Sequence, residues 1–271
     1  MSDSGNPVMA PTAERMVPQS SGITTFWEHI YRYHFASQFV KGKTVLDVAS
    51  GEGYGSASLL AAGAAKLIGI DISEEAVNHA RNKYNIDVRL GNGEAIPIND
   101  NEVDIVVSFE TIEHLTSPQK FIEECVRVLK IGGTIVLSTP LLETYGADNN
   151  NEHHVSEMSE SESIALFNKY FKNVKVYAQR PHSIQSWNAN IAADDSIVVQ
   201  VRKFWSNFLA RAVIKSGRLK LFWNPERFRE RPIDAIAAPT GLLYPFNPYR
   251  ITPRNRFGSL GPHYLILVGN K

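Results

Sequence analysis

The stretch KTVLDVASGEGYG, residues 43–55, decides the fold. Its first seven residues form an apolar run that predicts a short buried strand, and this run opens into a turn with three glycines. Glycines let a backbone pass close to a ligand and point amide N–H groups at it. Asp71 ends the next apolar run, 20 residues after Gly51. A carboxylate at that spacing can accept hydrogen bonds from both hydroxyls of a ribose.

Outward from this stretch, apolar runs alternate with amphipathic segments. Near-continuous apolar strands separated by helices indicate a parallel sheet that is covered on both faces. We therefore expect an α/β fold, a Rossmann-like doubly wound sheet of seven strands. The predicted strands are 43–49, 66–72, 87–92, 103–110, 132–140, 174–179 and 263–271. The predicted helices are 24–40, 56–65, 73–84, 117–130 and 156–171.

The chain divides into a short tail and one large domain. Residues 1–22 hold three prolines and no apolar run, which predicts a flexible tail without a signal peptide. Residues 23–271 are expected to form the domain. Within it, residues 181–262 are rich in proline, arginine and aromatic side chains, and we interpret them as an insertion before the last strand. No apolar stretch reaches the ~18 residues of a membrane span, so we expect a cytoplasmic protein.

Composition narrows the classes of function. The 271 residues include 28 lysines and arginines and 28 aspartates and glutamates, so the formal net charge is zero. This balance argues against a general nucleic-acid binder and against a disordered acidic protein. The single cysteine, Cys125, excludes both an intramolecular disulfide and a zinc cluster of thiolates.

The zero net charge is a cancellation between two regions. Residues 200–256 carry twelve basic and three acidic side chains, whereas residues 92–163 carry three basic and fourteen acidic ones. Three interpretations of the basic, aromatic region stay open. Its aromatic side chains pack the insertion onto the sheet while the charges are solvated, or its arginines belong to a substrate lid that binds a phosphate or acidic sugar. In the third, residues 200–231 make peripheral contact with the inner face of an anionic membrane.

The glycine turn is compatible with more than one ligand. A dinucleotide site has the pattern G-x-G-x-x-G, but the sixth position here is Ser56. Asp47, inside the first strand, suits a cationic ligand better than a pyrophosphate. S-adenosylmethionine carries a sulfonium and an ammonium group and needs no phosphate site. A turn that only makes a tight connection between strand and helix is the remaining alternative.

Four further segments occur in order around this turn. Together they resemble the class I S-adenosylmethionine-dependent methyltransferases, in the branch shared with quinone and small-molecule methyltransferases. The resemblance covers about residues 28–179 and implies S-adenosylmethionine as the cofactor. The segments are EHIYRYHFA (28–36), GNGEAIPIND (91–100), VDIVVSFETIEHL (103–115) and RVLKIGGTIVLSTP (127–140).

The resemblance also implies roles for single residues. The backbone at Gly51 and Gly53 would approach the methionine moiety. Asp47 would hold the amino group through water, and Asp71 would bind the ribose hydroxyls. Further cofactor contacts, along the adenine and on the methionine side, are implied for Tyr54, Ile72, Asn92, Gly93, Glu94, Phe109 and Glu110.

A looser similarity concerns the molecule that is methylated. The segments 28–36 and 107–115, with an N-x-x-H-x-x-E pattern at 151–157, resemble methyltransferases associated with glycan and polysaccharide assembly. This similarity implies a sugar or other small-molecule hydroxyl as acceptor, phosphate-bearing or lipid-linked. A quinone or another small molecule is the alternative acceptor. A cofactor-binding protein without turnover is the alternative of another class.

A hydroxyl acceptor must lose a proton, and histidine titrates near the pH at which a base is useful. His154 and then His114 are the catalytic candidates, with His153 behind them, because they follow the fourth and fifth strands. Each has a structural alternative, in which it only fixes a loop or the backbone. Asp148 and residues 152–154 could ligate magnesium, but a solvated polar loop is the favoured explanation, and no metal is predicted.

Overall fold

The computed structural model describes residues 16–18, 21–142, 154–180, 251–256 and 262–271. Most of the predicted tail and of the predicted insertion, including 200–231, therefore lies outside the described residues. Within the tail, Met16 and Val17 are buried, and the Val17 N–H donates to Ser21 Oγ at 2.9 Å. Each helix in the described part of the chain is too short or too polar to span a membrane.

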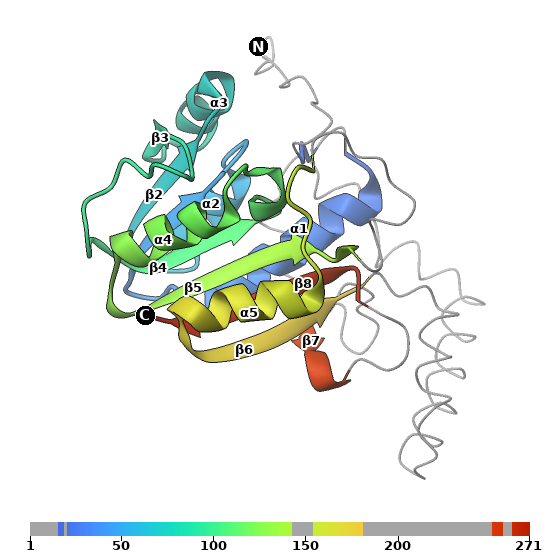
Figure 1. The fold of residues 1–271 in the computed structure, drawn as a ribbon. Coiled ribbons are helices and arrows are strands. Elements are labelled where there is room, and N and C mark those ends of the chain that lie inside the picture. The colour runs from blue at the N-terminus through green and yellow to red at the C-terminus, as the bar shows by residue number, and fades with distance from the viewer. Residues whose placement is uncertain (1–15, 19–20, 143–153, 181–250, 257–261) are drawn as a thin grey trace, which may run out of the picture.

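The described residues form one sheet of eight strands in the order β3-β2-β1-β4-β5-β8-β6-β7 (Figure 1). The strands β1 to β5 pair in parallel, which confirms the predicted α/β doubly wound fold. The sheet has one strand more than the seven predicted, because the two residues of β7 pair with the end of β6. The strands are β1 (Thr44–Val48), β2 (Lys66–Asp71), β3 (Val88–Leu90), β4 (Val103–Phe109), β5 (Leu129–Pro140), β6 (Lys172–Gln179), β7 (Thr252–Pro253) and β8 (Tyr264–Asn270).

The last strand runs against its neighbours. β8 lies between β5 and β6 and is antiparallel to both. Just before β8, the His263 N–H donates to the Gln179 carbonyl oxygen at the end of β6. β8 therefore starts at the edge of the sheet where β6 ends, and it has to run in the opposite direction.

Helices cover both faces of the sheet. α4 and α5 lie over one face and α1 over the other (Figure 1). The α-helices are α1 (Ile23–Ala36), α2 (Tyr54–Ala61), α3 (Glu74–Tyr84), α4 (Pro118–Val128) and α5 (Glu160–Tyr170). Short 3₁₀ helices are η1 (Ser37–Phe39), η2 (Ile112–His114) and η5 (Arg254–Arg256).

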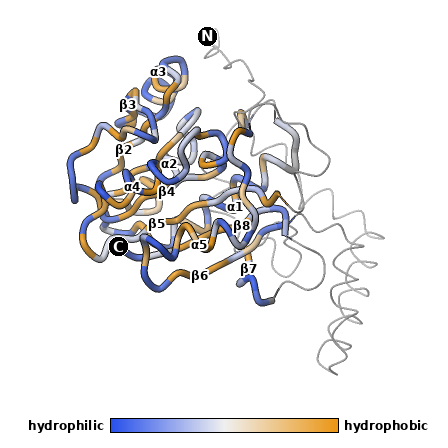
Figure 2. The backbone as a smooth tube through the Cα atoms, in the orientation of Figure 1, coloured by the Kyte–Doolittle hydropathy of each residue, from blue (hydrophilic) through white to orange (hydrophobic). Residues whose placement is uncertain are grey.

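The core follows the alternation of side chains along each strand. Val45 of β1 packs with α1 and α2, whereas the next residue, Leu46, packs on the opposite face with Phe121 of α4 and Phe167 of α5. The hydrophobic segments in Figure 2 accordingly follow the strands. Asp47 shares the face of Val45, so its carboxylate lies among side chains of α1 and α2.

Local hydrogen bonds move two helix ends away from their predicted positions. α5 begins at Glu160, four residues later than predicted, because the side chains and backbones of Ser159 and Glu162 form a capping box. α4 ends at Val128, two residues earlier than predicted, because Leu129 is extended and already belongs to β5.

Close packing at Gly55 yields a stability prediction. A Cβ atom on Gly55 would lie 2.0 Å from Cζ of Tyr33, a buried side chain of α1. Alanine normally stabilises a helix by ~1 kcal/mol relative to glycine. We nevertheless expect Gly55→Ala to lower the free energy of unfolding, by ~1–3 kcal/mol, because Tyr33 has to move.

Urea unfolding measures this change, and Gly22→Ala is the matched control. A Cβ on Gly22 meets its nearest atom, Oγ1 of Thr25, at an ordinary 3.9 Å. The control should change the free energy of unfolding by less than ~1 kcal/mol. A Gly55→Ala protein as stable as the parent would contradict the packing described here.

Candidate active site

A cavity of about 460 Å³ lies where β1, β2 and β4 end. Open α/β sheets place their ligand sites at this edge, and small-molecule sites usually enclose ~300–1,000 Å³. The predicted residues that line it are Gly51, Tyr54, Asp71, Ile72, Asn92, Gly93, Phe109, Glu110 and His114. The predicted residues Asp47, Gly53, Glu94 and His154 are not in its lining.

A second hollow, of about 610 Å³, lies between α5, β6 and η5. Its lining includes the ion pair in which Arg254 Nε donates to Glu160 Oε1 at 2.8 Å. None of the cofactor-binding or catalytic residues predicted from the sequence lines this hollow. The cavity at the strand ends is therefore the candidate active site.

The turn after β1 depends on left-handed backbone geometry. The φ angles of Ala49, Gly51 and Gly53 are 59°, 55° and 88°. At Gly53 a Cβ would lie only 2.5 Å from Cβ of Ala80 on α3. The glycine at this position thus lets α2 and α3 pack closely.

Asp71 fastens this turn to the neighbouring strand. One carboxylate oxygen accepts the Gly51 N–H at 2.8 Å, and the other accepts the Ser73 N–H at 2.9 Å. Each carboxylate oxygen has a second lone pair, so both can accept a further hydrogen bond from a ligand. Ile72 beside it is 75% exposed, although it is apolar. Asp71 and Ile72 together offer a polar and an apolar contact to one ligand.

Asp47 is buried beneath the turn. Its carboxylate accepts hydrogen bonds from Ser56 Oγ at 2.6 Å and from the Tyr33 hydroxyl at 3.3 Å. Burial raises the pKa of Asp47 to about 7, although these two hydrogen bonds act in the opposite direction. A cation in the cavity would favour the ionised carboxylate.

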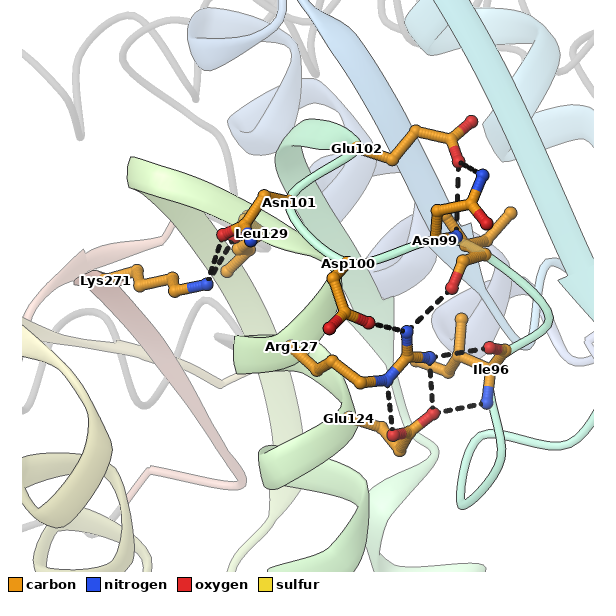
Figure 3. A network of polar contacts seen from close by, with 10 residues as sticks. Ile96, Asn99, Asp100, Asn101, Glu102, Glu124, Arg127, Leu129 and Lys271 are labelled. Carbon is orange, nitrogen blue, oxygen red and sulfur yellow. Dashed lines mark hydrogen bonds and ion pairs between the residues drawn. The ribbon is translucent and has the colours of Figure 1, made fainter.

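The loop after β3, residues 91–102, forms another wall of the cavity. Arg127 of α4 holds this loop, because it donates to the carbonyl oxygen of Ile96 and to the carboxylate of Asp100 (Figure 3). Asn92 and Gly93 line the cavity. Glu94 does not, because its carboxylate accepts the Ser117 N–H at the start of α4.

A buried ionic network stands behind the end of β4. Glu110 adopts a left-handed backbone, with φ of 50°, and its Oε1 accepts a hydrogen bond from Ser138 Oγ at 2.6 Å. The same oxygen lies 3.8 Å from Nη1 of Arg32, which is fully buried. Arg32 also stacks over the ring of Tyr264, 4.4 Å from its centre. Burial raises the pKa of the nearby Glu28 to about 7, against the attraction of Arg32.

The structure brings His114 and His154 together. Their ring centres are 4.9 Å apart, although the two residues lie 40 positions apart in the chain. His154 Nδ1 is 2.5 Å from Glu157 Oε1, and the carboxylate of Glu113 is buried beside both rings. Burial is the main reason that the pKa of Glu113 is well above its usual value. His153 lies outside the described residues, as do Asp148 and Glu152.

Sequence reasoning missed Tyr33 and Glu113. Tyr33 lines the cavity and donates to Asp47, and Glu113 belongs to the histidine cluster. Both residues occur in segments that carry the family resemblance, EHIYRYHFA and VDIVVSFETIEHL. That membership was the only signal, because the contacts depend on which helix faces which strand.

Comparisons with known proteins show which sequences this chain resembles. Residues 46–137 match the family model of a methyltransferase domain. A probable S-adenosylmethionine-dependent methyltransferase of Mycolicibacterium smegmatis is 37% identical over 57% of this chain and 62% of its own. A ubiquinone biosynthesis O-methyltransferase of Coxiella burnetii is 30% identical over 55% of this chain and 62% of its own. The chain thus spans about 60% of the length of the curated relatives that it matches.

Solved structures show the same fold. A methyltransferase of Thermotoga maritima aligns with a TM-score of 0.57 over 92% of this chain and 91% of its own, at 15% identity. One of Archaeoglobus fulgidus aligns with a TM-score of 0.55 over 93% and 96%, at 16% identity. The chain therefore has the Rossmann-like fold of these structures, and residues 46–137 resemble a methyltransferase domain. In sequence, this chain is similar to S-adenosylmethionine-dependent methyltransferases.

The cavity fits S-adenosylmethionine, the cofactor that the names of these relatives give. The carboxylate of Asp71 retains lone pairs for ribose hydroxyls, and the exposed apolar Ile72 gains from being covered by a flat ring such as adenine. The buried Asp47 suits a cation in its vicinity. S-adenosylmethionine offers a ribose, an adenine and two positive charges.

The buried carboxylate of Asp47 predicts a pH dependence of stability. The pKa of Asp47 is about 7 in the folded protein, whereas it is 3.8 without the surrounding fold. Between pH 3.8 and pH 7 the folded state therefore binds more protons than the unfolded state. Stability must therefore fall as the pH rises through this range. We expect Asp47→Asn to reduce the loss of unfolding free energy between pH 5 and pH 8 by on the order of 2 kcal/mol.

Urea unfolding at both pH values measures this loss. Glu28, whose pKa is also raised to about 7, keeps part of the slope in the variant. The exposed Asp87 provides the control, because Asp87→Asn should leave the slope unchanged. An Asp47→Asn protein with the slope of the parent would show that Asp47 is ionised throughout this range.

Proposed function

We propose that the protein transfers the methyl group of S-adenosylmethionine to a hydroxyl group of a small molecule, with a sugar as the leading acceptor. The observation that supports this proposal is the arrangement of one cavity. Asp71 and Ile72 lie at its cofactor side, and His114 lies in the same lining, beside His154. A carboxylate that can bind a ribose and a lining histidine, with a second histidine beside it, suit methyl transfer to a hydroxyl.

Each cofactor contact is part of this proposal. Asp71 accepts hydrogen bonds from the ribose hydroxyls, and Asp47 acts on the amino group through water. Ile72 packs on the adenine. Around the adenine and the methionine side, the remaining proposed contacts come from Gly51, Gly53, Tyr54, Asn92, Gly93, Glu94, Phe109 and Glu110. In addition, Gly53 lets α2 approach α3, and Glu94 fixes the loop to α4.

The chemistry needs alignment and the removal of one proton. When bound, S-adenosylmethionine supplies a methyl group that its sulfonium activates. Holding the acceptor oxygen in line with that methyl group can supply ~7–11 kcal/mol of the barrier. A hydroxyl is a poor nucleophile while it is protonated. We assign its activation to His154 and His114.

A quinone-type acceptor is the second candidate. It is favoured by the relatives that are named ubiquinone biosynthesis O-methyltransferases. Methyl-labelled S-adenosylmethionine added to extracts of the source cells distinguishes the two acceptors. Label in the saccharide fraction supports the sugar, and label in the quinone fraction supports the quinone. A protein that binds the cofactor but transfers no label would instead be a binding protein without turnover.

Loss of the Asp71 carboxylate tests the cofactor site. We expect Asp71→Ala to raise the dissociation constant for S-adenosylmethionine by at least ~100-fold, because two charge-assisted hydrogen bonds of ~1.5–3 kcal/mol each are lost. Calorimetric titration measures this constant. Asp87→Asn serves as the control and should bind like the parent, since Asp87 is not in the cavity lining. Absence of binding by the parent at millimolar cofactor would refute the proposed function.

The basic region at 181–262 is proposed as the acceptor-recognition or lid segment of the domain 23–271. Its residues 200–231 are proposed to contact the anionic inner face of a membrane, which suits a lipid-linked acceptor in a cytoplasmic protein. The charge and aromatic content of that region support both ideas.

Vesicle sedimentation tests the membrane contact. We expect the full-length protein to sediment with anionic vesicles and to be released as the salt concentration rises, because salt screens charges. Neutral vesicles are the control and should leave the protein in the supernatant. Equal recovery on both kinds of vesicle, or none on either, would contradict the membrane contact and favour the lid.

A further inference from the structure

We propose that Glu113, His114 and His154 form a binding site for a divalent transition-metal ion beside the acceptor end of the cavity. One ligand atom from each residue can be chosen so that all three lie within 4.8 Å of one another. Glu113 and His114 belong to η2, and His154 precedes α5. No single stretch of sequence contains this site, because its third ligand comes from a different part of the chain.

Backbone hydrogen bonds hold the two parts of the site together. The carbonyl oxygen of Glu113 accepts the N–H groups of both Val155 and Ser156 at 3.0 Å. In addition, Ser156 Oγ donates to the carbonyl oxygen of Leu115 at 2.7 Å. The residues that follow His154 are thus fixed against the backbone on both sides of His114. Such backbone contacts hold the two parts of the site near each other before an ion binds.

Further side chains orient two of the ligands. Glu157 Oε1 lies 2.5 Å from His154 Nδ1, which leaves Nε2 of that imidazole as the ligating nitrogen. Thr139 Oγ1 donates to Glu113 Oε2 at 3.3 Å, and Oε1 of the same carboxylate is 4.0 Å from His114 Nε2. A carboxylate on the far nitrogen of a histidine is a regular companion of metal ligation.

The donor set selects the kind of ion. Ligands at ~2.0–2.2 Å from a metal are about 3–3.5 Å apart, so the cluster has to contract by about an ångström. Two imidazoles with one carboxylate favour zinc, manganese or iron over magnesium and calcium, which prefer oxygen ligands. Three protein ligands leave at least one position for another molecule. Magnesium ligation through Asp148 and residues 152–154 was the alternative weighed from the sequence, and this site differs from it in ligands and in metal.

The open position gives the site a role that rests on the proposed function. His114 and Val155 line the cavity, so a molecule in the cavity can reach the ion. A divalent ion next to an acceptor hydroxyl favours its deprotonated form. The hydroxyl loses its proton to solvent, its oxygen forms the new O–C bond, the S–C bond of the cofactor breaks, and S-adenosylhomocysteine leaves. His114 and His154 thus activate the hydroxyl through the ion that they hold, and neither of them takes the proton.

Metal titration of the full-length, tag-free protein tests the site. The metal-stripped protein is titrated calorimetrically with zinc, manganese and magnesium salts, and bound metal is counted by mass spectrometry after dialysis. We expect one equivalent of zinc or manganese, bound at least ten times more tightly than magnesium. His154→Ala and Glu113→Gln should weaken this binding at least 100-fold. Glu157→Gln should weaken it ~10–100-fold, as is usual for a residue that orients a ligand.

His34→Ala is the matched control, because His34 lies on α1 and outside the cavity lining, and it should bind metal like the parent. Cofactor titration of every variant shows that the fold is intact. Absence of zinc and manganese binding, or equal binding by the parent and the His154→Ala and Glu113→Gln variants, would overturn the site. S-adenosylmethionine binding in the metal-stripped protein separates the two proposals, since its loss there would count against the proposed function alone.

Discussion

The two hydrogen bonds of the Asp71 carboxylate, to the amides of Gly51 and Ser73, join the ends of β1 and β2. They fix the turn after β1 in its left-handed geometry, and they place the start of α3 beside that turn. Because adjacent parallel strands end at the same edge of the sheet, one carboxylate can hold both connections. The cavity has its shape because the hydrogen bonds of Asp71 hold the backbone at this edge in place.

Buried and half-buried ionisable groups lie around the same edge. Asp47 lies under the turn, Glu110 and Arg32 stand behind the end of β4, and Glu113 lies beside the histidines. Burying a charge without a partner costs free energy, and a core of apolar side chains has no such cost. Arg32 meets that cost partly through Gln179, Glu110 and the ring of Tyr264. Strained and partly unpaired groups are typical of a site that acts on a ligand, and this concentration separates the cavity from the hollow near α5.

Most of the fold could be predicted from the sequence, since apolar strands such as 66–72 and amphipathic helices such as 73–84 have clear periodicity. The ends were less certain, because a capping box moved the start of α5 and β5 began directly after α4. The direction of β8 was not readable from its residues. The direction of β8 depends on the edge at which the chain re-enters the sheet. The hydrogen bond from the His263 N–H to the Gln179 carbonyl oxygen shows that this edge is the one where β6 ends.

By itself the sequence determined the class of fold, the glycine turn and the acidic residues that follow it, because these features depend on local spacing along the chain. The tertiary structure decided which of the predicted residues share the cavity. In the folded chain Tyr33 donates a hydrogen bond to Asp47, and Gly53 packs against Ala80. His154 lies next to Glu113 and His114. These contacts join residues far apart in the chain, and they depend on how helices pack on the two faces of the sheet.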